Sequence, residues 1–372
     1  MAYKRPTIAL IDTASLKHNL GEIKRLVGSD TAVMAVIKAN AYGHGDLMTA
    51  NALTEAGCEM FGVAYVEEAV RLREGGVEGK IFVLAGIFEG QYDDIIEYAL
   101  TPVVWDSKTA EEINSSAAKK GVTVPVHVKI DTGMGRLGVL TPEAPEFFKK
   151  LKNLKHLEVE GVMSHLAESE AEDKSFSLEQ INAFEKCLAE IASLGIKPKY
   201  THIANGAAAV SIPKSRYNLV RPGLMLYGVY PSPSLKNLVA LKPALEFRTA
   251  VSALKTVKSG TPVSYSRTFT AKRDSTLAIL PIGYGDGLRV ALSNSLNVII
   301  NGSYAPVVGR ICMDLCVADV TDVKNVKPGD EAVIIGRRGD KAVTAEDLAL
   351  TAKTIPYEIL TGISVRVNRV KA

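Results

Sequence analysis

What the sequence has little of already excludes several protein classes. Its four cysteines (Cys58, Cys187, Cys312 and Cys316) are few and widely spaced, which disfavours a disulfide scaffold and predicts buried thiols in a reducing compartment. No apolar run approaches the roughly 18 residues that span a bilayer, and residues 1–20 lack the apolar core of a signal peptide. The formal net charge is only +3, which predicts no basic surface for nucleic acid or anionic lipid. We therefore expect a cytoplasmic protein that binds neither nucleic acid nor membrane.

Two further absences concern cofactors. The histidines show no spacing that is typical of metal ligands, so no metal site is expected. We interpret His127 and His202 instead as core residues within strands. No G-x-G-x-x-G motif follows a predicted strand, and this disfavours a dinucleotide-binding fold, in which such a motif forms the phosphate loop.

Apolar residues are plentiful and regularly arranged. They make up 47% of the 372 residues, which is enough for two domains with sizeable cores. Between about residues 30 and 225, short strand-like runs alternate with helical ones. The predicted strands are 35–38, 61–64, 81–85, 102–105, 124–130, 157–163, 200–203 and 219–220, and the predicted helices between them are 46–56, 67–74, 92–100, 107–120 with Ser107 as its N-cap, 142–150, 175–194 and 207–210. Strict alternation predicts an α/β fold with a parallel (β/α)8 barrel of the TIM type, and an open doubly wound sheet is the alternative.

The pattern changes after a proline-rich stretch at residues 230–244. We place a domain boundary there, which gives a barrel domain at 1–240 and a mainly β domain at 241–372. The predicted strands of the second domain are 244–257, 277–281, 297–300, 305–308, 316–320 and 331–335, with one helix near 345–354. Asn301 and Gly302 between two of these strands favour a tight hairpin turn.

Polar residues follow the ends of several predicted barrel strands, where they would face one common bowl. They are Lys38, Arg136, His165, Asn205 with Gly206, and Arg221 with Gly223. A lysine there is costly to bury and suits covalent imine chemistry, although a solvated loop charge is the ordinary alternative. Asn205 and Gly206 open a helix of small residues in one of the last two loops, where this fold commonly binds phosphate. A phosphate at one end of the bowl and an imine-forming lysine at the other is the layout that pyridoxal phosphate needs.

Six motifs stand along the chain in a specific order. They are AVIKANAYGHG (35–45), KIDTGMGRLG (129–138), VRPGLMLYG (220–228), PVSYS (262–266), GYGDG (283–287) and GRICMD (309–314). In this order and spacing they resemble the bacterial alanine racemases across nearly the whole chain. The resemblance implies an eight-stranded α/β barrel followed by a β domain, with pyridoxal 5′-phosphate as cofactor and alanine as substrate. It also implies a head-to-tail homodimer whose active sites are shared across the interface.

By this resemblance two residues act as catalytic bases. Lys38 would hold pyridoxal phosphate as an aldimine and act on one face, and Tyr265 of the partner subunit would act on the other. Racemisation passes through a planar carbanion and needs a proton acceptor and a donor on opposite faces, which one lysine cannot supply. A free tyrosine has a pKa of about 10, so Tyr265 needs neighbours that favour its phenolate. His165 and Arg221 match the hydrogen-bonded chain that supplies them in the family.

The resemblance also assigns the groups around the cofactor ring and the substrate. Arg221 would face the pyridine nitrogen and leave it unprotonated, because an arginine keeps its proton; related barrel decarboxylases present an acid there. Arg136 would bind the substrate carboxylate, together with the backbone N–H of Met313. Lys129 matches a position that some members carry as a carbamate bracing Arg136, and we expect the same here.

The remaining site residues concern the phosphate and the substrate path. Phosphate contacts would come from Tyr42, Asn205, Gly206, Gly223 and Tyr357. The family often has serine where this chain has Gly206, so here only a backbone N–H can serve. Tyr284 and Arg310 match a narrow substrate corridor, whose small clearance favours alanine over longer side chains.

We therefore predict an isomerase that interconverts L- and D-alanine and supplies D-alanine for peptidoglycan. A pyridoxal-phosphate decarboxylase of basic amino acids is one alternative, which Arg221 disfavours. A non-catalytic pyridoxal-phosphate-binding regulatory protein is another, although such proteins resemble the barrel alone. A racemase of broader substrate range is the third, and that class tends to be exported.

Overall fold

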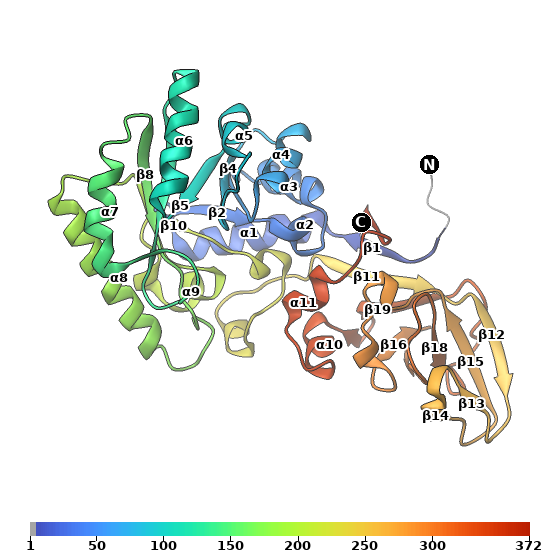
Figure 1. The fold of residues 1–372 in the computed structure, drawn as a ribbon. Helices are drawn as coiled ribbons and strands as arrows, with labels where there is room; N and C mark the ends of the chain where they lie inside the picture. The colour runs from blue at the N-terminus through green and yellow to red at the C-terminus, as the bar shows by residue number, and fades with distance from the viewer. Residues whose placement is uncertain (1–4) are drawn as a thin grey trace. The chain divides into compact units, whose positions relative to one another are not determined.

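The computed structural model describes residues 5–372, and residues 1–4 of the predicted first domain lie outside the described part of the chain. The chain divides into two compact units. The barrel unit comprises Ser15–Ala41 and Asp46–Lys242, and the β unit comprises the described residues up to Ala14, Tyr42–Gly45 and Pro243–Ala372. Figure 1 labels the elements of both. The domain division at residue 240 stays a prediction.

The barrel unit is built around eight parallel strands. They are β2 (Ala32–Val36), β3 (Met60–Val63), β4 (Lys80–Val83), β5 (Thr101–Val104), β6 (Val124–Asp131), β8 (Leu157–Met163), β9 (Tyr200–His202) and β10 (Leu219–Val220). They pair in the order β10-β2-β3-β4-β5-β6-β8-β9, and the short β7 (Val139–Leu140) adds to β6. A parallel bridge between Asn205 and Arg221, just beyond β9 and β10, closes the ring. The predicted barrel is confirmed, and the open-sheet alternative is wrong.

Helices connect these strands and cover the outside of the barrel (Figure 1). They are α1 (Thr13–Val27), α2 (Lys38–Tyr42), α3 (Asp46–Glu55), α4 (Val66–Glu74), α5 (Tyr92–Glu97), α6 (Ser107–Lys120), α7 (Ala144–Leu151), α8 (Ser175–Ser193) and α9 (Gly206–Ser211). The inner strands read as apolar runs because helices cover one face and the core fills the other; Met34, Phe82 and Leu219 pack together there, fully buried. Ser107 is not the N-cap of α6, since the Asp106 carboxylate accepts the Thr109 N–H and takes that role.

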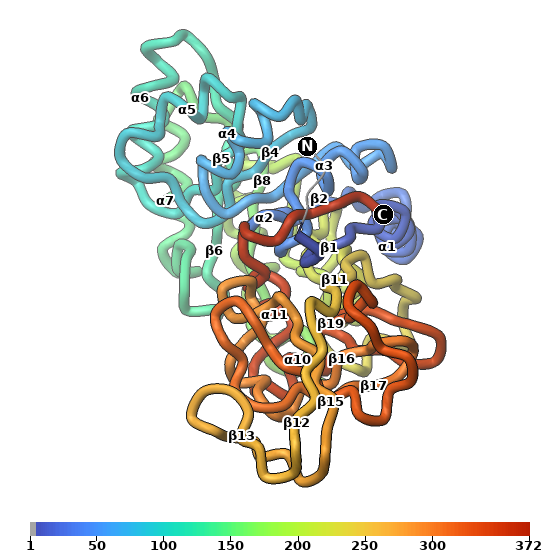
Figure 2. The backbone as a smooth tube through the Cα atoms, turned by 90° about the vertical axis from the view of Figure 1, so that its right-hand side faces the viewer, coloured from blue at the N-terminus to red at the C-terminus, as the bar shows by residue number. Residues whose placement is uncertain are grey.

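The β unit contains three sheets. Its strands are β1 (Ile8–Ile11), β11 (Leu245–Ala250), β12 (Ala253–Val257), β13 (Pro262–Val263), β14 (Phe269–Thr270), β15 (Ser275–Leu280), β16 (Asn297–Ile300), β17 (Ser303–Pro306), β18 (Cys316–Asp319), β19 (Glu331–Arg338), β20 (Lys341–Val343) and β21 (Asn368–Lys371). The largest sheet runs β17-β16-β19-β11-β1-β21, with β20 on β19; β12-β15-β18 and β13-β14 are the others. Figure 2 shows β1 beside β11, with which it pairs in antiparallel register.

Several details of the β unit differ from the sequence-based expectation. Residues 8–11 were expected with the barrel, but β1 pairs with β11 and β21. The predicted strand 244–257 is two strands, broken at residues 251–252. The one helix predicted near 345–354 is α10 (Ala345–Thr351), and a second helix, α11 (Pro356–Thr361), follows it where none was predicted. The Asn301–Gly302 hairpin is confirmed, because both residues have positive φ and join β16 to β17.

Two further observations concern membrane-spanning helices and the cysteines of the described residues. No helix within residues 5–372 is long and apolar enough to cross a membrane. The four cysteines are free thiols; three are buried, as predicted, and Cys312 is only partly buried.

Candidate active site

Lys38 stands directly before a left-handed helical turn. Residues 39–42 all have φ between 52° and 55°. Such a conformation costs about 1–2 kcal/mol per non-glycine residue, so its backbone groups need partners. The Ala39 N–H donates to Glu68 Oε1 of α4 at 2.6 Å. Glu68 thus helps to hold the turn that ends the lysine's strand.

The Lys38 ammonium lies in an environment that disfavours its charge. The side chain is partly buried. Burial and then the charge of Arg136 lower the pKa of Lys38, while the carboxylate of Glu68 acts in the opposite direction. A lysine whose pKa is lowered is a better amine nucleophile and a better base near neutral pH.

Arg136 is held by a tightly folded loop after β6. Asp131 Oδ1 accepts the backbone N–H groups of residues 133–135 at 2.9–3.1 Å. Gly138 has φ 133°, and a Cβ there would lie 2.6 Å from the Asp131 nitrogen. The KIDTGMGRLG motif therefore needs its aspartate and this glycine to fold the loop, and it leaves the Arg136 side chain exposed.

Lys129 lies in β6 and is buried. Burial, followed by the charges of Arg221 and Arg136, lowers the pKa of Lys129 to about 8. A substantial fraction of this amine is therefore uncharged slightly above neutral pH. The structure thus places Lys129 where Arg136 and Arg221 both influence it.

Arg221 is buried, with only 4% of its surface exposed. Its Nη1 lies 2.7 Å from His202 Nδ1. Its Nη2 donates to the backbone oxygens of Ser164 at 2.7 Å and Ile203 at 3.1 Å, and lies 3.2 Å from His165 Nδ1. Burial lowers the pKa of Arg221 to about 9, so that the guanidinium remains charged at neutral pH. Burial and then the charge of Arg221 hold the pKa of His165 well below its usual range.

The predicted phosphate loops lie beyond β9 and β10. Asn205 caps α9, because its Oδ1 accepts the Ala208 N–H at 3.0 Å. Gly206 is the first residue of that helix, and a Cβ there would lie 3.3 Å from Met225 Sδ. Gly223 is buried and precedes a short 3-10 turn, Leu224–Tyr227.

In the β unit, the two tyrosines predicted to bind phosphate lie side by side. The ring centroids of Tyr42 and Tyr357 are 5.9 Å apart. Gly43, which follows Tyr42, has φ 84°, and a Cβ there would lie 2.2 Å from the Leu360 carbonyl oxygen of α11. Arg369 Nε donates to the Gly43 carbonyl at 2.9 Å. These contacts fix the segment Tyr42–Gly45 within the β unit.

Tyr265 stands on the surface of the β unit, on a loop that is firmly held. Its side chain is 69% exposed. Ser264, the preceding residue, has φ 63° and donates its hydroxyl to the Arg310 carbonyl at 2.5 Å. A Cβ at Gly309 would lie 2.8 Å from the Val263 oxygen. The PVSYS and GRICMD motifs therefore pack backbone against backbone and bring Tyr265 and Arg310 onto neighbouring loops.

The GYGDG motif packs against the same loop from the other side. The N–H groups of Tyr284 and Gly285 donate to the Cys312 and Met313 carbonyls, both at 2.9 Å. A Cβ at Gly283 would lie 2.2 Å from the Cys312 oxygen, so only glycine permits this approach. The side chains of Tyr284 and Met313 are about half exposed.

Sequence reasoning missed two residues that contact the predicted ones. Glu68 binds the turn after Lys38, and its other oxygen accepts the Ala64 N–H at 2.7 Å. His202 was interpreted as a core residue and is fully buried, but it also contacts Arg221. The position of His202 at the end of a barrel strand was the available signal, and its apolar setting hid it.

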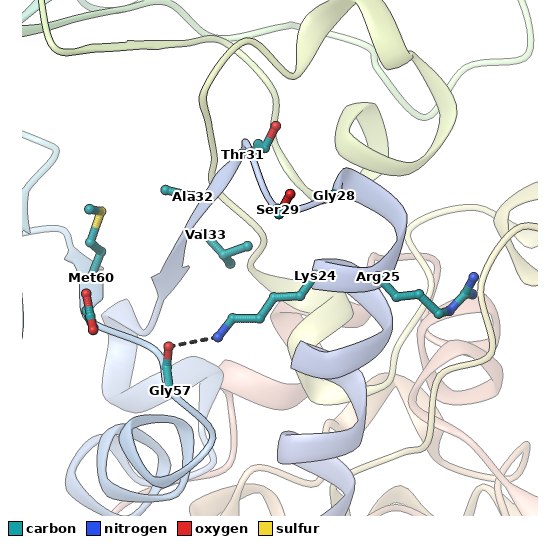
Figure 3. Close-up of a pocket in the computed structure, with 10 residues that line it drawn as sticks. Lys24, Arg25, Gly28, Ser29, Thr31, Ala32, Val33, Gly57 and Met60 are labelled. Carbon is teal, nitrogen blue, oxygen red and sulfur yellow. Dashed lines mark hydrogen bonds between the residues drawn. The ribbon is translucent and has the colours of Figure 1, made fainter.

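A cavity in the barrel unit lies apart from all of these residues (Figure 3). It is lined by Lys24 and Arg25 of α1, by residues 31–33 at the start of β2 and by Glu59 and Met60 at the start of β3. Lys24 Nζ is bonded to the Gly57 carbonyl at 2.7 Å. This is the amino end of the strands, whereas the sites of such barrels lie at the carboxyl end. Within residues 5–372, no group of three or more His, Cys, Asp or Glu side chains could hold a metal ion.

Comparisons with known proteins agree along the whole chain. The model of the alanine racemase N-terminal domain matches residues 11–231, and that of the C-terminal domain matches residues 244–371. The alanine racemase of Halothermothrix orenii is 43% identical, over 98% of this chain and 96% of that protein. The structure of alanine racemase from Bacillus anthracis with bound L-Ala-P is 32% identical, covers 100% of this chain and 96% of that one, and has a TM-score of 0.93. Alanine racemase from Bartonella henselae with covalently bound pyridoxal phosphate is 32% identical over 99% of each chain, with a TM-score of 0.87.

Proposed function

This chain belongs to the alanine racemase family, and we propose that it interconverts L-alanine and D-alanine by a two-base mechanism. Family membership confirms the predicted fold class, the enzyme class of pyridoxal-phosphate-dependent isomerases and the cofactor. The observation that carries the proposal is the environment of Lys38. This partly buried amine lies at the carboxyl end of the barrel, and burial and the charge of Arg136 lower its pKa.

The residues at this end of the barrel suit pyridoxal phosphate by their chemistry. Lys38 supplies the amine that can bind the cofactor covalently. Asn205 Oδ1 already accepts the Ala208 N–H, which leaves the N–H groups of Gly206 and Ala207, without partners within the helix, available to an anion. The buried Arg221 supplies a charged group that only donates hydrogen bonds.

The proposed reaction divides proton transfer between two side chains. The bound cofactor withdraws electrons from the substrate and makes its Cα proton removable. Lys38 Nζ takes or returns this proton on one face, and Tyr265 Oη of the partner subunit does so on the other. Arg136 binds the carboxylate as a guanidinium fork, with the Met313 N–H as a second donor, and so keeps the Cα between the two bases.

Arg221 distinguishes this proposal from the decarboxylase alternative. The guanidinium is charged at neutral pH and can only donate. If the pyridine nitrogen of the bound cofactor faced Arg221, the guanidinium would leave that nitrogen unprotonated, and the ring would withdraw electrons less strongly than one that faces an acid. We propose that Arg221 limits side reactions such as transamination in this way.

We propose a homodimer in which each subunit completes its partner's site. The barrel domain at 1–240 would bind the cofactor, and the domain at 241–372 would supply Tyr265. The exposure of Tyr265, with Tyr284 and Met313 nearby on interlocked loops, supports this proposal. Tyr265 would need the cover and cationic surroundings of a second subunit to act as a base.

We further propose that Lys129 is carbamylated. Carbon dioxide reacts with an uncharged amine, and the pKa of Lys129 is lowered to about 8. A carbamate there would replace a cation by an anion and brace Arg136 instead of repelling it. Added mass equal to one carbon dioxide on the peptide that holds Lys129 would support the modification.

Substrate range and cellular role complete the proposal. The corridor that Tyr284 and Arg310 would form with Tyr265 favours alanine, because longer side chains would not fit. We place the enzyme in the cytoplasm, where it would supply D-alanine for peptidoglycan.

One experiment separates the proposed function from its alternatives. The purified enzyme is incubated with each alanine enantiomer in heavy water, and loss of the Cα proton and formation of the other enantiomer are followed. We expect exchange and racemisation from both directions. Release of carbon dioxide from basic amino acids would indicate the decarboxylase, and bound cofactor without any exchange would indicate the regulatory protein.

A further inference from the structure

A line of polar side chains runs through the core of the barrel unit. His127 of β6 and His202 of β9 are fully buried, and His127 Nδ1 is hydrogen bonded to His202 Nε2 at 2.7 Å. At one end His202 Nδ1 lies 2.7 Å from Arg221 Nη1. At the other end His127 Nε2 faces Glu160 Oε2 of β8 at 3.4 Å, longer than a formed hydrogen bond; both atoms are buried, and within residues 5–372 neither has another hydrogen-bond partner. The line therefore joins Arg221 of the candidate site to a carboxylate inside the sheet.

The surroundings hold His127 in one orientation. A Cβ at Gly161 would lie 2.4 Å from His127 Cε1, so only glycine leaves space for the ring. The Phe82 ring packs against the imidazole edge at a centroid distance of 4.8 Å. Because the ring has no room to turn, the hydrogen-bond partners decide which of its nitrogens carries the proton.

Hydrogen-bond chemistry assigns the proton positions along the line. A guanidinium can only donate, so His202 Nδ1 accepts from Arg221, and the proton of a neutral His202 is on Nε2. That proton is donated to His127 Nδ1, which places the proton of His127 on Nε2, facing Glu160. An ionised carboxylate can only accept, so Glu160 matches this end. Donation runs in one direction, from Arg221 to Glu160.

The charges of the four groups agree with this assignment. Burial lowers the pKa of His127 and holds that of His202 well below its usual range, so both imidazoles are neutral near pH 7. Burial alone would raise the pKa of Glu160, but the neighbouring His127 ring and the hydrogen bond from Lys80 lower it to about 2. The buried cation of Arg221 and the anion of Glu160 are thus connected through two neutral rings.

We infer that Glu160 is a positioning residue for the racemase reaction. By accepting a hydrogen bond from His127 Nε2–H, Glu160 holds His202 in the tautomer that accepts from Arg221, and so it fixes the orientation of the Arg221 guanidinium. The importance of this orientation for catalysis rests on the proposed function, but the tautomer of His202 does not. Glu160 touches neither substrate nor cofactor in this account.

The contact between Lys80 and Glu160 makes it possible to reverse the direction of the hydrogen bonds along the line by a single substitution at Glu160. Lys80 Nζ is 2.5 Å from Glu160 Oε1, on the oxygen that does not face His127. In Glu160→Gln the ammonium of Lys80 requires the amide oxygen, which turns the amide NH2 toward His127. His127 Nε2 must then accept, its proton moves to Nδ1, and the proton of His202 moves to its own Nδ1. Two donors, His202 and Arg221, then face each other.

Three variants of the holoenzyme test this reasoning. Tautomers are read from the ¹⁵N chemical shifts of His202 in histidine-labelled protein, and kcat and KM for alanine are measured in both directions. In the wild type and in Lys80→Met we expect an unprotonated Nδ1 of His202 and the same kcat. In Glu160→Gln we expect a protonated Nδ1 and, because Glu160 does not contact the substrate, a kcat lowered about tenfold with little change in KM; the size follows the loss seen when a carboxylate that orients a metal-bound histidine is removed.

The double variant Lys80→Met/Glu160→Gln is the matched rescue. Without the ammonium, the amide is free to turn its oxygen to His127, so the wild-type tautomer and kcat should return. A role of Glu160 in folding alone would leave the double variant no better than Glu160→Gln. The inference is overturned if Glu160→Gln leaves His202 unchanged or if the double variant does not recover. Because the tautomer is read without turnover, failure of the proposed function would not obscure either result.

Discussion

The candidate residues of the barrel unit and those of the β unit are held in opposite ways. In the barrel unit, Arg221 and Lys129 are buried with at most 5% of their surface exposed, and they act on each other through their charges. In the β unit, Tyr265 is 69% exposed and Met313 52% exposed. Arg221 is held by side-chain hydrogen bonds inside the core. The β-unit residues are held by loops whose backbones interlock while the side chains face outward.

This difference in burial indicates which group of candidate residues already has its working environment within one unit. Burial has already lowered the pKa values of Lys38, Lys129 and Arg221 within one barrel unit. An exposed phenol has no such environment and must be covered before it can act as a base near neutral pH. The comparison therefore favours a site that is prepared on one subunit and completed by another.

Replacing Lys38 should abolish the function of the barrel-unit part of the site. In Lys38→Ala the amine that binds the cofactor is absent, so the absorbance of the covalently bound cofactor and racemisation in both directions should disappear. Ultraviolet-visible spectra and exchange in heavy water check this. Lys129→Met, which retains Lys38, serves as the control and should keep the absorbance. Residual two-way racemisation in Lys38→Ala would contradict the role of this lysine.

Replacing Tyr265 should impair only the contribution of the exposed β-unit residues to the site. In Tyr265→Ala the cofactor should still bind, but exchange should slow more for one enantiomer than for the other, since one face has lost its base. Rates for L- and D-alanine measured in heavy water test this. Equal slowing of both enantiomers would contradict the assignment of Lys38 and Tyr265 to opposite faces.

Mixing the two inactive variants should test whether the halves come from different subunits. A heterodimer of Lys38→Ala and Tyr265→Ala chains has one site with both bases and one with neither. After denaturation and joint refolding in equal amounts, about one quarter of the wild-type activity should return if dimers form at random. Each variant refolded alone is the control. No recovery in a mixture that contains heterodimers would mean that each site uses its own tyrosine.

Replacing Lys129, a buried residue of the barrel unit, should have a smaller effect on activity than replacing Lys38 or Tyr265. If its carbamate braces Arg136, Lys129→Ala should raise KM for alanine about tenfold, as loss of one charge-assisted contact does. Occupancy of the carbamate in added bicarbonate should rise with pH through about 8, because the uncharged amine increases there. Mass spectrometry of the intact protein and KM measured with and without bicarbonate check both. A KM that does not respond to bicarbonate while the mass does would argue against a bracing role.

The smallest expected effect is at Gly206. Gly206→Ser adds a hydroxyl donor at the start of α9, but its Cβ would lie 3.3 Å from the flexible Met225 side chain, which must shift slightly. We expect affinity for the cofactor to improve about threefold, since one added hydrogen bond contributes roughly 0.5–1.5 kcal/mol. Dialysis with measured cofactor retention tests this. Gly206→Ala is the control, because it adds the same crowding without the donor.

Local patterns predicted most of the fold, and the family resemblance supplied most of the candidate residues. The barrel was predictable because each strand and helix carries its own hydrophobic period, and alternation alone decides the topology. Sequence motifs named residues such as Arg136 and Tyr265, whereas the close backbone approaches at Gly283 and Gly309 became visible only in the structure. The roles of these residues stay predictions.

Contacts between distant residues were not predictable from such patterns. β1 is a short apolar strand that gives no sign that its partner begins at Leu245. The left-handed turn at 39–42 consists of residues that usually avoid it, and Glu68, which holds it, lies 29 positions away from Ala39. The tautomer of His202 depends on Glu160, and a sequence shows neither the rings nor their orientation.

The short segment Tyr42–Gly45 has a consequence for how this protein can be divided. It belongs to the β unit although barrel residues stand on both sides of it in the sequence. A single cut near residue 242 would therefore separate two stretches from the rest of the β unit: the described residues up to Ala14, which include β1, and the segment Tyr42–Gly45, which begins four positions beyond Lys38. Gene splitting or domain exchange at that point should therefore yield fragments that do not fold separately.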